Sequence, residues 1–307
     1  MNIIVLVKQV PDTHNVTGDA MTPEGTVNRA ALPAIFNPDD LFALEAALQI
    51  KDSHPGTKVN VLCMGPPAAA AVLKDCLYRG ADFTALVSDR GFAGADTLAT
   101  SYALSCAIKK IGSYDLVLCG RQAIDGDTAQ VGPQTAEKLG INQITCVSNI
   151  ESLTKNDIIA VRSIEGGWEK VKTSLPVLLT FTAEGESPRP PSAIKAMTYK
   201  RTVPVSGGAG SPSDPFGEEI GKADGNANGV VDGAASGAAS GATVPMALWD
   251  IPAINADPLQ CGLAGSPTKV KKIDSVVLTA ADIKYIEPSE AGIHELIHGL
   301  IADHTFG

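Results

Sequence analysis

Short runs of aliphatic and β-branched residues alternate along the first 120 positions with longer segments whose apolar residues recur at helical spacing. The short runs occupy residues 3–7, 59–64, 85–88 and 116–119. The helical patterns begin near Pro38, Pro67 and Asp96. This alternation is typical of a parallel sheet covered by helices on both faces. The sequence therefore predicts an α/β protein with an open, mainly parallel, doubly wound sheet.

Capping signals support two of these helices. Asn37-Pro38-Asp39-Asp40 supplies an N-cap residue, a proline for the first turn and two acids ahead of a run with apolar residues at helical spacing. Asp96 precedes another helical run, which Gly112 follows. We expect helices from Pro38 and from Thr97.

From about residue 147 to residue 182 the pattern changes. Strand-like pieces occupy residues 158–162, 170–173 and 177–181, and Glu165-Gly166-Gly167 between the first two is typical of a tight turn. We interpret this region as an antiparallel extension of the sheet.

The chain after residue 205 has a different composition. Gly, Ala and Ser fill most of residues 206–243, which predicts a flexible insertion because so little apolar surface is available for burial. An extended arm and one amphipathic helix from about Ser289 follow in residues 244–307, and we expect them to dock on a partner subunit. The predicted units are therefore an α/β nucleotide-binding domain at residues 1–205, the insertion, and the C-terminal arm with its helix.

Composition narrows the function classes. The 307 residues carry 24 basic and 34 acidic side chains, a balance that does not suit a nucleic-acid backbone. The six cysteines are scattered and form no C-x-x-C pair, as expected for reduced thiols in a cytoplasmic protein. No basic leader precedes the first apolar run, and no run reaches the length of a membrane span. We expect no nucleic-acid partner and no membrane insertion.

Candidate chemistry lies in the loops after the predicted strands, because ligands of open parallel sheets sit beyond the carboxyl ends of the strands. Four loops stand out: residues 8–36, 64–67, 89–97 and 120–133. The first is long enough to fold over a ligand, and the next two lead into helix starts, which favour anions.

The fourth loop, G-R-Q-A-I-D-G-D-T-A-Q-V-G-P, is the richest. Its glycines would let the backbone approach a ligand, and amides near Thr128 and Val131 would bind phosphate. Asp125 and Asp127 would take ribose hydroxyls or cap a helix. The sequence has neither G-x-G-x-x-G nor a P-loop, so a plain turn remains the alternative to a nucleotide site.

Together these features resemble the β (small) subunits of electron-transfer flavoproteins. The motifs are V-K-Q-V-P-D at residues 7–12, Asn37-Pro38, Met64-Gly65-Pro66, the R-G-A-D at residues 79–82, residues 115–120 and the whole fourth loop. The resemblance covers about residues 1–205 and the last 60 residues. The Gly/Ala/Ser-rich insertion is not typical of that family.

The resemblance implies a heterodimer with a larger α subunit that carries its own FAD. Some β subunits hold AMP and serve as simple carriers, with a loop that looks like D-D-D-x-x-Q-T-G. The loop here, D-G-D-T-A-Q-V-G, and the stretch at residues 89–100 are similar to members that hold a second FAD and use NADH. Those members send one electron to ferredoxin and the other through the α subunit to a flavin dehydrogenase. We expect this bifurcating type, with the AMP-holding carrier as alternative.

The same resemblance assigns residues to roles. The positions expected to bind the adenine nucleotide are Leu6, Asn37, Pro38, Asp39, Asp40, Met64, Gly65, Ala123, Ile124, Asp125, Gly126, Asp127, Thr128, Ala129, Gln130, Val131, Gly132, Pro133 and Gln134. Those on the flavin or NADH side are Arg90, Phe92, Asp96 and Thr97. Those expected to dock on the dehydrogenase are Pro188, Arg189, Pro190, Pro191 and Ile194. The alternative for each group is structural: ordinary caps and turns, or a proline-rich turn.

Two other functions compete with this interpretation. His294-Glu295-Leu296-Ile297-His298 is a literal H-E-x-x-H zinc-protease motif, with His304 at the spacing of a third ligand. Ile301 stands where the long form of that motif has glycine, so we do not expect a metal site. A stress-type nucleotide-binding module would share the sheet and the adenine site but would need no flavin.

Overall fold

The computed structural model describes residues 1–12, 33–206, 245–268 and 285–302. Ten strands form one sheet: β1 (Asn2–Val7), β4 (Lys58–Met64), β5 (Phe83–Val87), β6 (Leu116–Gly120), β7 (Asn142–Leu153), β8 (Asp157–Ile164), β9 (Gly167–Ser174), β10 (Val177–Phe181), β11 (Val205–Ser206) and β12 (Met246–Trp249). The α-helices are α1 (Pro38–Ser53), α2 (Ala70–Arg79), α3 (Thr97–Ile111), α4 (Val131–Leu139), α5 (Ala193–Tyr199) and α6 (Glu290–Ala302). Short 3₁₀ turns are η3 (Pro67–Ala69), η4 (Arg90–Phe92), η5 (Pro252–Ile254) and η6 (Pro258–Gln260), and β2 (Gln9–Pro11) pairs with β3 (Ala34–Phe36).

The sheet has the order β11-β12-β5-β4-β1-β6-β10-β7-β8-β9. Every pair from β11 to β7 is parallel, whereas β7–β8 and β8–β9 are antiparallel. This topology confirms the predicted fold class, an open and mainly parallel sheet with an antiparallel extension. The turn at residues 165–167 is also confirmed, since it joins β8 to β9.

Helices cover both faces of the parallel part, as a doubly wound sheet requires. On one face Ile3 and Val5 of β1 pack with buried residues of α1 and α2. On the other face Ile4 and Leu6 pack with α3 and α4. Because successive residues of a strand point to opposite faces, β1 is apolar throughout and is buried on both sides.

The strand β10 corrects one expectation. Residues 177–181 were expected in the antiparallel extension, but β10 lies between β6 and β7 and is parallel to both. All five of its residues are buried, the continuous apolar pattern of a central parallel strand. The strand β7 also starts at Asn142, before the predicted onset of the region.

The beginning of the predicted C-terminal arm is likewise part of the main sheet. The strand β12 pairs in parallel with β5, and its Met246, Ala247 and Trp249 are buried. Of the predicted flexible insertion, only Ser206 is described, in β11, and residues 207–243 lie outside the described residues. The proposed division into units remains a prediction.

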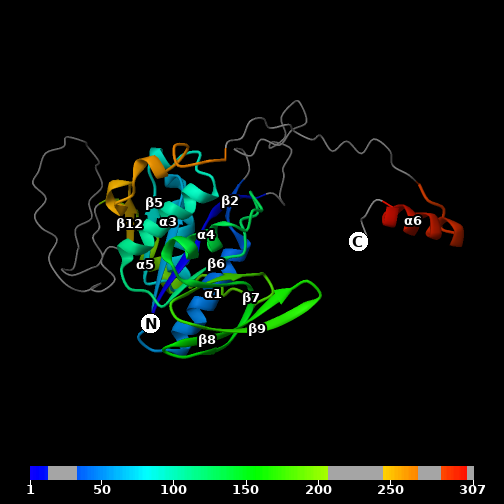
Figure 1. Ribbon diagram of the computed structural model, residues 1–307, viewed down its shortest axis with the longest axis horizontal. Helices are drawn as coiled ribbons and strands as arrows, with labels where there is room; N and C mark the ends of the chain where they lie inside the picture. The colour runs from blue at the N-terminus through cyan, green and yellow to red at the C-terminus, as the bar shows by residue number, and fades with distance from the viewer. Residues whose placement is uncertain (13–32, 207–244, 269–284, 303–307) are drawn as a thin grey trace, which may run out of the picture.

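The predicted C-terminal helix is present as α6, and Figure 1 draws it apart from the sheet. Four of its apolar side chains are exposed: Ile293, Leu296, Ile297 and Ile301. Among the residues that the structure describes, no helix is both long enough and apolar enough to span a bilayer.

The two tryptophans test the position of β12, because Trp249 is 1% exposed and Trp168 on β9 is 68% exposed. We expect Trp249→Ala to lower the free energy of unfolding by about 3–5 kcal/mol, as for other fully buried large side chains. Trp168→Ala should change it by less than about 0.5 kcal/mol. Urea denaturation of both variants measures this, and equal small effects would contradict the placement of β12 in the core.

Candidate functional site

The chain reverses its direction of travel across the sheet at β1, which has β4 on one side and β6 on the other. The helix α1, which follows β1, packs on one face, while α4, which follows β6, packs on the opposite face. The helices that follow β1 and β6 therefore lie on opposite faces of the sheet, and the carboxyl ends of these two strands form its topological switch point, hereafter the crevice. Ligands of open α/β sheets bind at such a switch point.

The first turn of α1 fastens the segments that leave β1 and β6. The carboxylate of Asp40 accepts hydrogen bonds from the amide of Lys8 at 2.8 Å and from the amide of Gly120 at 2.9 Å. The side chain of Asn37 donates to the carbonyl oxygen of Gln122 at 2.8 Å and accepts from the amide of Ile124 at 3.1 Å. Asn37 holds the N-cap position, but its side chain makes no capping bond. It serves the loop instead, which corrects the expectation that it caps α1.

Burial makes the Asp40 side chain a weaker acid than an ordinary aspartate. Its side chain is enclosed, and desolvation raises its pKa from 3.8 to about 7, although the hydrogen bonds from Asn37, Gly120 and Lys8 act in the opposite direction. Burial also raises the pKa of the neighbouring Asp39, and the Arg121 guanidinium, 3.8 Å away, partly offsets this.

Two glycines of the fourth loop are required by packing. A methyl group on Gly120 would lie 2.5 Å from Oδ1 of Asp40, and one on Gly132 would lie 2.7 Å from Cγ2 of Thr180. These glycines let α1 approach β6 and let α4 approach β10. The sequence predicts that the glycines of this loop make room for a ligand. Among Gly120, Gly126 and Gly132, only Gly126 has open space around it.

The outer part of the loop, residues 126–130, is exposed. Asp127 and Ala129 adopt positive φ angles of 48° and 53°, an uncommon conformation for residues other than glycine. Lys8 Nζ lies 2.7 Å from Oδ1 of Asp125. Asp125 therefore forms an ion pair instead of capping a helix. This ion pair places the Lys8 ammonium group beside the loop.

The sequence reasoning assigned no role to Lys8 or Arg121. Both are about half exposed, with 45% of each side chain accessible, and each pairs with an aspartate at the crevice. Their positions directly after β1 and β6 are the signal that would have identified them.

The third loop contacts the fourth through side-chain hydrogen bonds. Thr97 Oγ1 donates to Oε1 of Gln130 at 2.9 Å, and Gln134 Nε2 donates to Thr97 Oγ1 at 3.4 Å. Asp96 caps α3 as predicted, by accepting from the amides of Leu98 and Ala99. Three predicted site residues, Thr97, Gln130 and Gln134, are thus brought together.

The other residues of the third loop have contrasting environments. Arg90 is exposed, whereas Phe92 is buried in the core beneath the loop. Residues of the C-terminal part contact this loop. The Ser266 hydroxyl accepts a hydrogen bond from the amide of Asp96, and the amide of Thr268 donates to the carboxylate of Asp96. The structure thus presents the Arg90 side chain to solvent and buries Phe92.

The remaining adenine positions lie at neighbouring strand ends. Leu6 is buried near the end of β1, and Met64, at the end of β4, is half-buried. The amide of Gly65 donates to the carbonyl of Val87 and so joins the ends of β4 and β5.

The predicted docking residues lie elsewhere. Arg189 bonds to α1 at Glu45, and the amide of Ser192 bonds to the carbonyl of Tyr78 in α2. The structure therefore separates this segment from the residues of the crevice.

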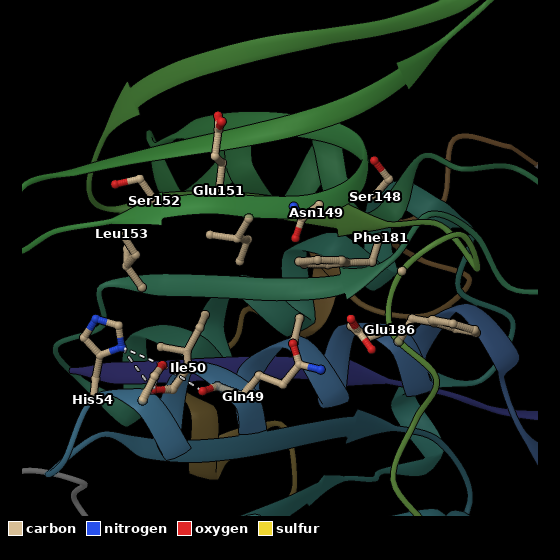
Figure 2. Close-up of a pocket in the computed structure, with 15 residues that line it drawn as sticks. Gln49, Ile50, His54, Ser148, Asn149, Glu151, Ser152, Leu153, Phe181 and Glu186 are labelled. Atoms are coloured by element: carbon tan, nitrogen blue, oxygen red, sulfur yellow. Dashed lines mark hydrogen bonds between the residues drawn. The ribbon is translucent and has the colours of Figure 1, made fainter.

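A second hollow, of about 250 Å³, lies between α1 and β7. Figure 2 shows Gln49 and Ile50 of α1, with His54 just after its end, facing Asn149 and Leu153 of β7 across it. Its lining mixes apolar and polar side chains and includes none of the residues predicted to bind a cofactor.

The H-E-x-x-H motif lies on α6, where the rings of His294 and His298 are 4.5 Å apart. Among the described residues, no group of three or more His, Cys, Asp or Glu side chains is arranged to hold a metal ion. His304, the third residue of the competing zinc hypothesis, lies outside the described residues.

Comparison with known proteins identifies the family. A family model described as the electron transfer flavoprotein domain matches residues 24–206. The electron transfer flavoprotein subunit beta of Clostridium acetobutylicum is 42% identical over 273 residues, which cover 89% of this chain and 87% of that protein.

This chain belongs to the electron transfer flavoprotein β-subunit family. Two other relatives are the caffeyl-CoA reductase-Etf complex subunit CarD of Acetobacterium woodii and the acryloyl-CoA reductase electron transfer subunit gamma of Anaerotignum propionicum. The CarD subunit is 52% identical over a stretch that covers 62% of this chain and 71% of its own length. The gamma subunit is 49% identical over a stretch that covers 59% of this chain and 67% of its own length. Electron transfer flavoproteins carry flavin or nucleotide cofactors and work as complexes of subunits, so the crevice at β1 and β6 is the candidate cofactor site.

The contact between Gly120 and Asp40 can be tested by a matched pair of substitutions in one loop. Gly120→Ala should destabilise the protein by about 1–3 kcal/mol or more, because its methyl group would force α1 away from β6. Gly126→Ala should be close to neutral, since nothing lies within 4 Å of the added methyl group. Thermal unfolding compares them, and equal stability would contradict the close approach of α1 to β6.

The raised pKa of Asp40 predicts a pH dependence of stability. Between about pH 4 and pH 7 the folded protein holds a proton on Asp40 that the unfolded chain releases, so stability falls as pH rises through this window and levels off above it. A shift of this size corresponds to roughly 4 kcal/mol. Asp40→Asn, which cannot ionise, should lose this slope when urea denaturation is followed from pH 4.5 to 8. Parallel curves for the two proteins would contradict the assignment.

Proposed function

We propose that this chain is the β subunit of a bifurcating electron transfer flavoprotein that binds FAD at the crevice between β1 and β6. Bound FAD would accept a hydride from NADH and deliver one electron to ferredoxin and the other, through the α-subunit FAD, to a flavin dehydrogenase. The chain's own residues bind and orient the cofactor, and no side chain acts as a catalyst.

The residues present fit an adenine nucleotide with a phosphate group. The exposed residues 126–130 lead into the start of α4, where backbone amides and the helix dipole favour an anion. Lys8 and Arg121 bring two cations to the same crevice. The loop is held at its base by Asn37 and Asp40, so little conformational entropy would be lost on binding.

We infer individual roles for the residues of this site. Residues 126–131 would bind the phosphates through backbone amides, and Asp127 would bind a ribose hydroxyl. Asn37 and Asp40 would act indirectly, because their polar atoms are used in holding the loop. Thr97, through Gln130, would fix the third loop beside the site, where Arg90 is exposed.

Two exposed apolar surfaces would serve the protein partners. The stripe on α6, formed by Ile293, Leu296, Ile297 and Ile301, would dock on the α subunit. Ile194 and Met197 of α5 line a shallow hollow, are 80% and 66% exposed, and would dock on the dehydrogenase. Exposed apolar patches of this kind often mark interaction sites. We also propose a cytoplasmic location.

The cofactor content of the co-purified αβ complex tests the proposed function. We expect two FAD and no AMP in the supernatant of the denatured complex, and NADH oxidation that depends on both ferredoxin and a dehydrogenase. One FAD and one AMP per complex would instead identify a simple carrier. A complex with two FAD that oxidises NADH without ferredoxin would contradict bifurcation.

A further inference from the structure

The segment at residues 187–199, hereafter the docking segment, is fixed mainly by polar contacts. None of the residues of α5 is buried, and the large apolar side chains Ile194 and Met197 face solvent. Tyr199, at the end of α5, packs only partly against the core. Apolar burial therefore contributes little to the position of this segment.

Arg189 makes the densest set of these contacts. Its Nε lies 2.9 Å and 3.1 Å from the two carboxylate oxygens of Glu45, and its Nη2 lies 2.9 Å from Oε1. Its backbone amide donates to the same carboxylate at 3.0 Å, and its Nη2 also donates to Asp52 at 2.8 Å. Arg79 of α2 donates to its carbonyl oxygen. Arg189 is thus bonded to α1 and α2 through both its side chain and its backbone.

Glu45 gives this contact its importance. It is 5% exposed, so its charge depends on the guanidinium and the amide of Arg189 for compensation, together with a weaker bond from Gln49 at 3.3 Å. A bidentate ion pair to a buried carboxylate is directional, and breaking it is costly because the carboxylate charge is left uncompensated. These bonds also raise the pKa of Arg189, so its charge is permanent.

We propose that Arg189 is a positioning residue, which fastens the docking segment to α1 through Glu45 and so presents Ile194 and Met197, instead of binding the dehydrogenase itself. This inference rests on the proposed docking of the segment and changes the role expected for Arg189 from the sequence. Its Nε and Nη2 are bonded to Glu45 and Asp52 within the chain, and the apolar side chains beyond it are left for the partner.

Amide hydrogen exchange of the full chain in complex with its α subunit tests the positioning role directly. In Arg189→Gln and Glu45→Gln, the amides of Ser192 and Ala196 should exchange about tenfold faster or more, because the segment opens locally, while amides of β1 and β4 stay unchanged. Arg201→Gln, the same change at an exposed arginine just beyond the segment, is the control and should have no effect. Unchanged exchange in Arg189→Gln would overturn the proposal.

The double variant Glu45→Gln/Arg189→Gln separates a loosened segment from a misfolded protein. It leaves no uncompensated buried charge, so its core should be as stable as that of the parent while Ser192 and Ala196 still exchange fast. Its effect on these amides should also be smaller than the sum of the single effects, since the two residues act as one contact. Additive effects would overturn the pairing.

The third test measures electron transfer from the αβ complex to an acyl-CoA dehydrogenase that the complex reduces. It distinguishes a failure of the positioning role from a failure of the proposed docking. Arg189→Gln should raise the KM for the dehydrogenase several-fold and leave kcat within about twofold. Ile194→Ala should raise the same KM without changing exchange in the segment. A normal KM in Ile194→Ala would refute the docking proposal alone. A raised KM in Arg189→Gln with unchanged exchange would show that Arg189 binds the partner directly, which would overturn the positioning role.

Discussion

The buried carboxyl group of Asp40 joins the start of α1 to the carboxyl ends of two central strands. It accepts the amides of Lys8 and Gly120, which leave β1 and β6 at the switch point of the sheet. The contact is possible only because residue 120 has no side chain. Enclosure of a carboxyl group is unfavourable for its charged form, and the raised pKa of Asp40 expresses that cost. The candidate cofactor site depends on this interaction because it sets the distance between the carboxyl ends of β1 and β6 and the start of α1.

The helix α1 supports two distant regions that are proposed to have different functions. Its first turn holds the base of the fourth loop through Asn37, and its middle holds the docking segment through Glu45. Between these points α1 packs against the sheet and contributes buried residues such as Leu44 and Leu48 to the core. A helix fixed along its length in this way keeps both attachments at a constant separation. In the proposed function, electron transfer between a bound flavin and a docked partner would benefit from such fixed geometry.

The sequence correctly predicted the elements that are determined by residues close together in the chain. The alternating runs gave the parallel sheet, and Asp96 gave the start of α3, because strand patterns and caps depend on neighbours in the chain. The position of β12 was missed, because a four-residue run after a low-complexity segment does not specify its partner strand, and burial of Trp249 follows from tertiary contacts. The role of Asn37 was misjudged for the same reason, since its hydrogen-bond partners lie 85 and 87 positions away. The pairing of Arg189 with Glu45 spans 144 positions and has no periodic pattern to reveal it.

The distribution of apolar side chains distinguishes a subunit from a self-sufficient protein. The central strands β1, β6 and β10 bury all of their apolar residues, whereas large apolar side chains of α5 and α6 remain exposed. Exposure of Ile194 and Met197 contributes nothing to the stability of the isolated chain, so their segment is held by the ion pair at Glu45, whose strength does not require apolar burial. Polar attachment thus leaves the apolar face available for a partner, while the core alone provides the cooperative stability of the fold. The same separation explains why substitutions in the docking segment should alter complex formation before they alter folding.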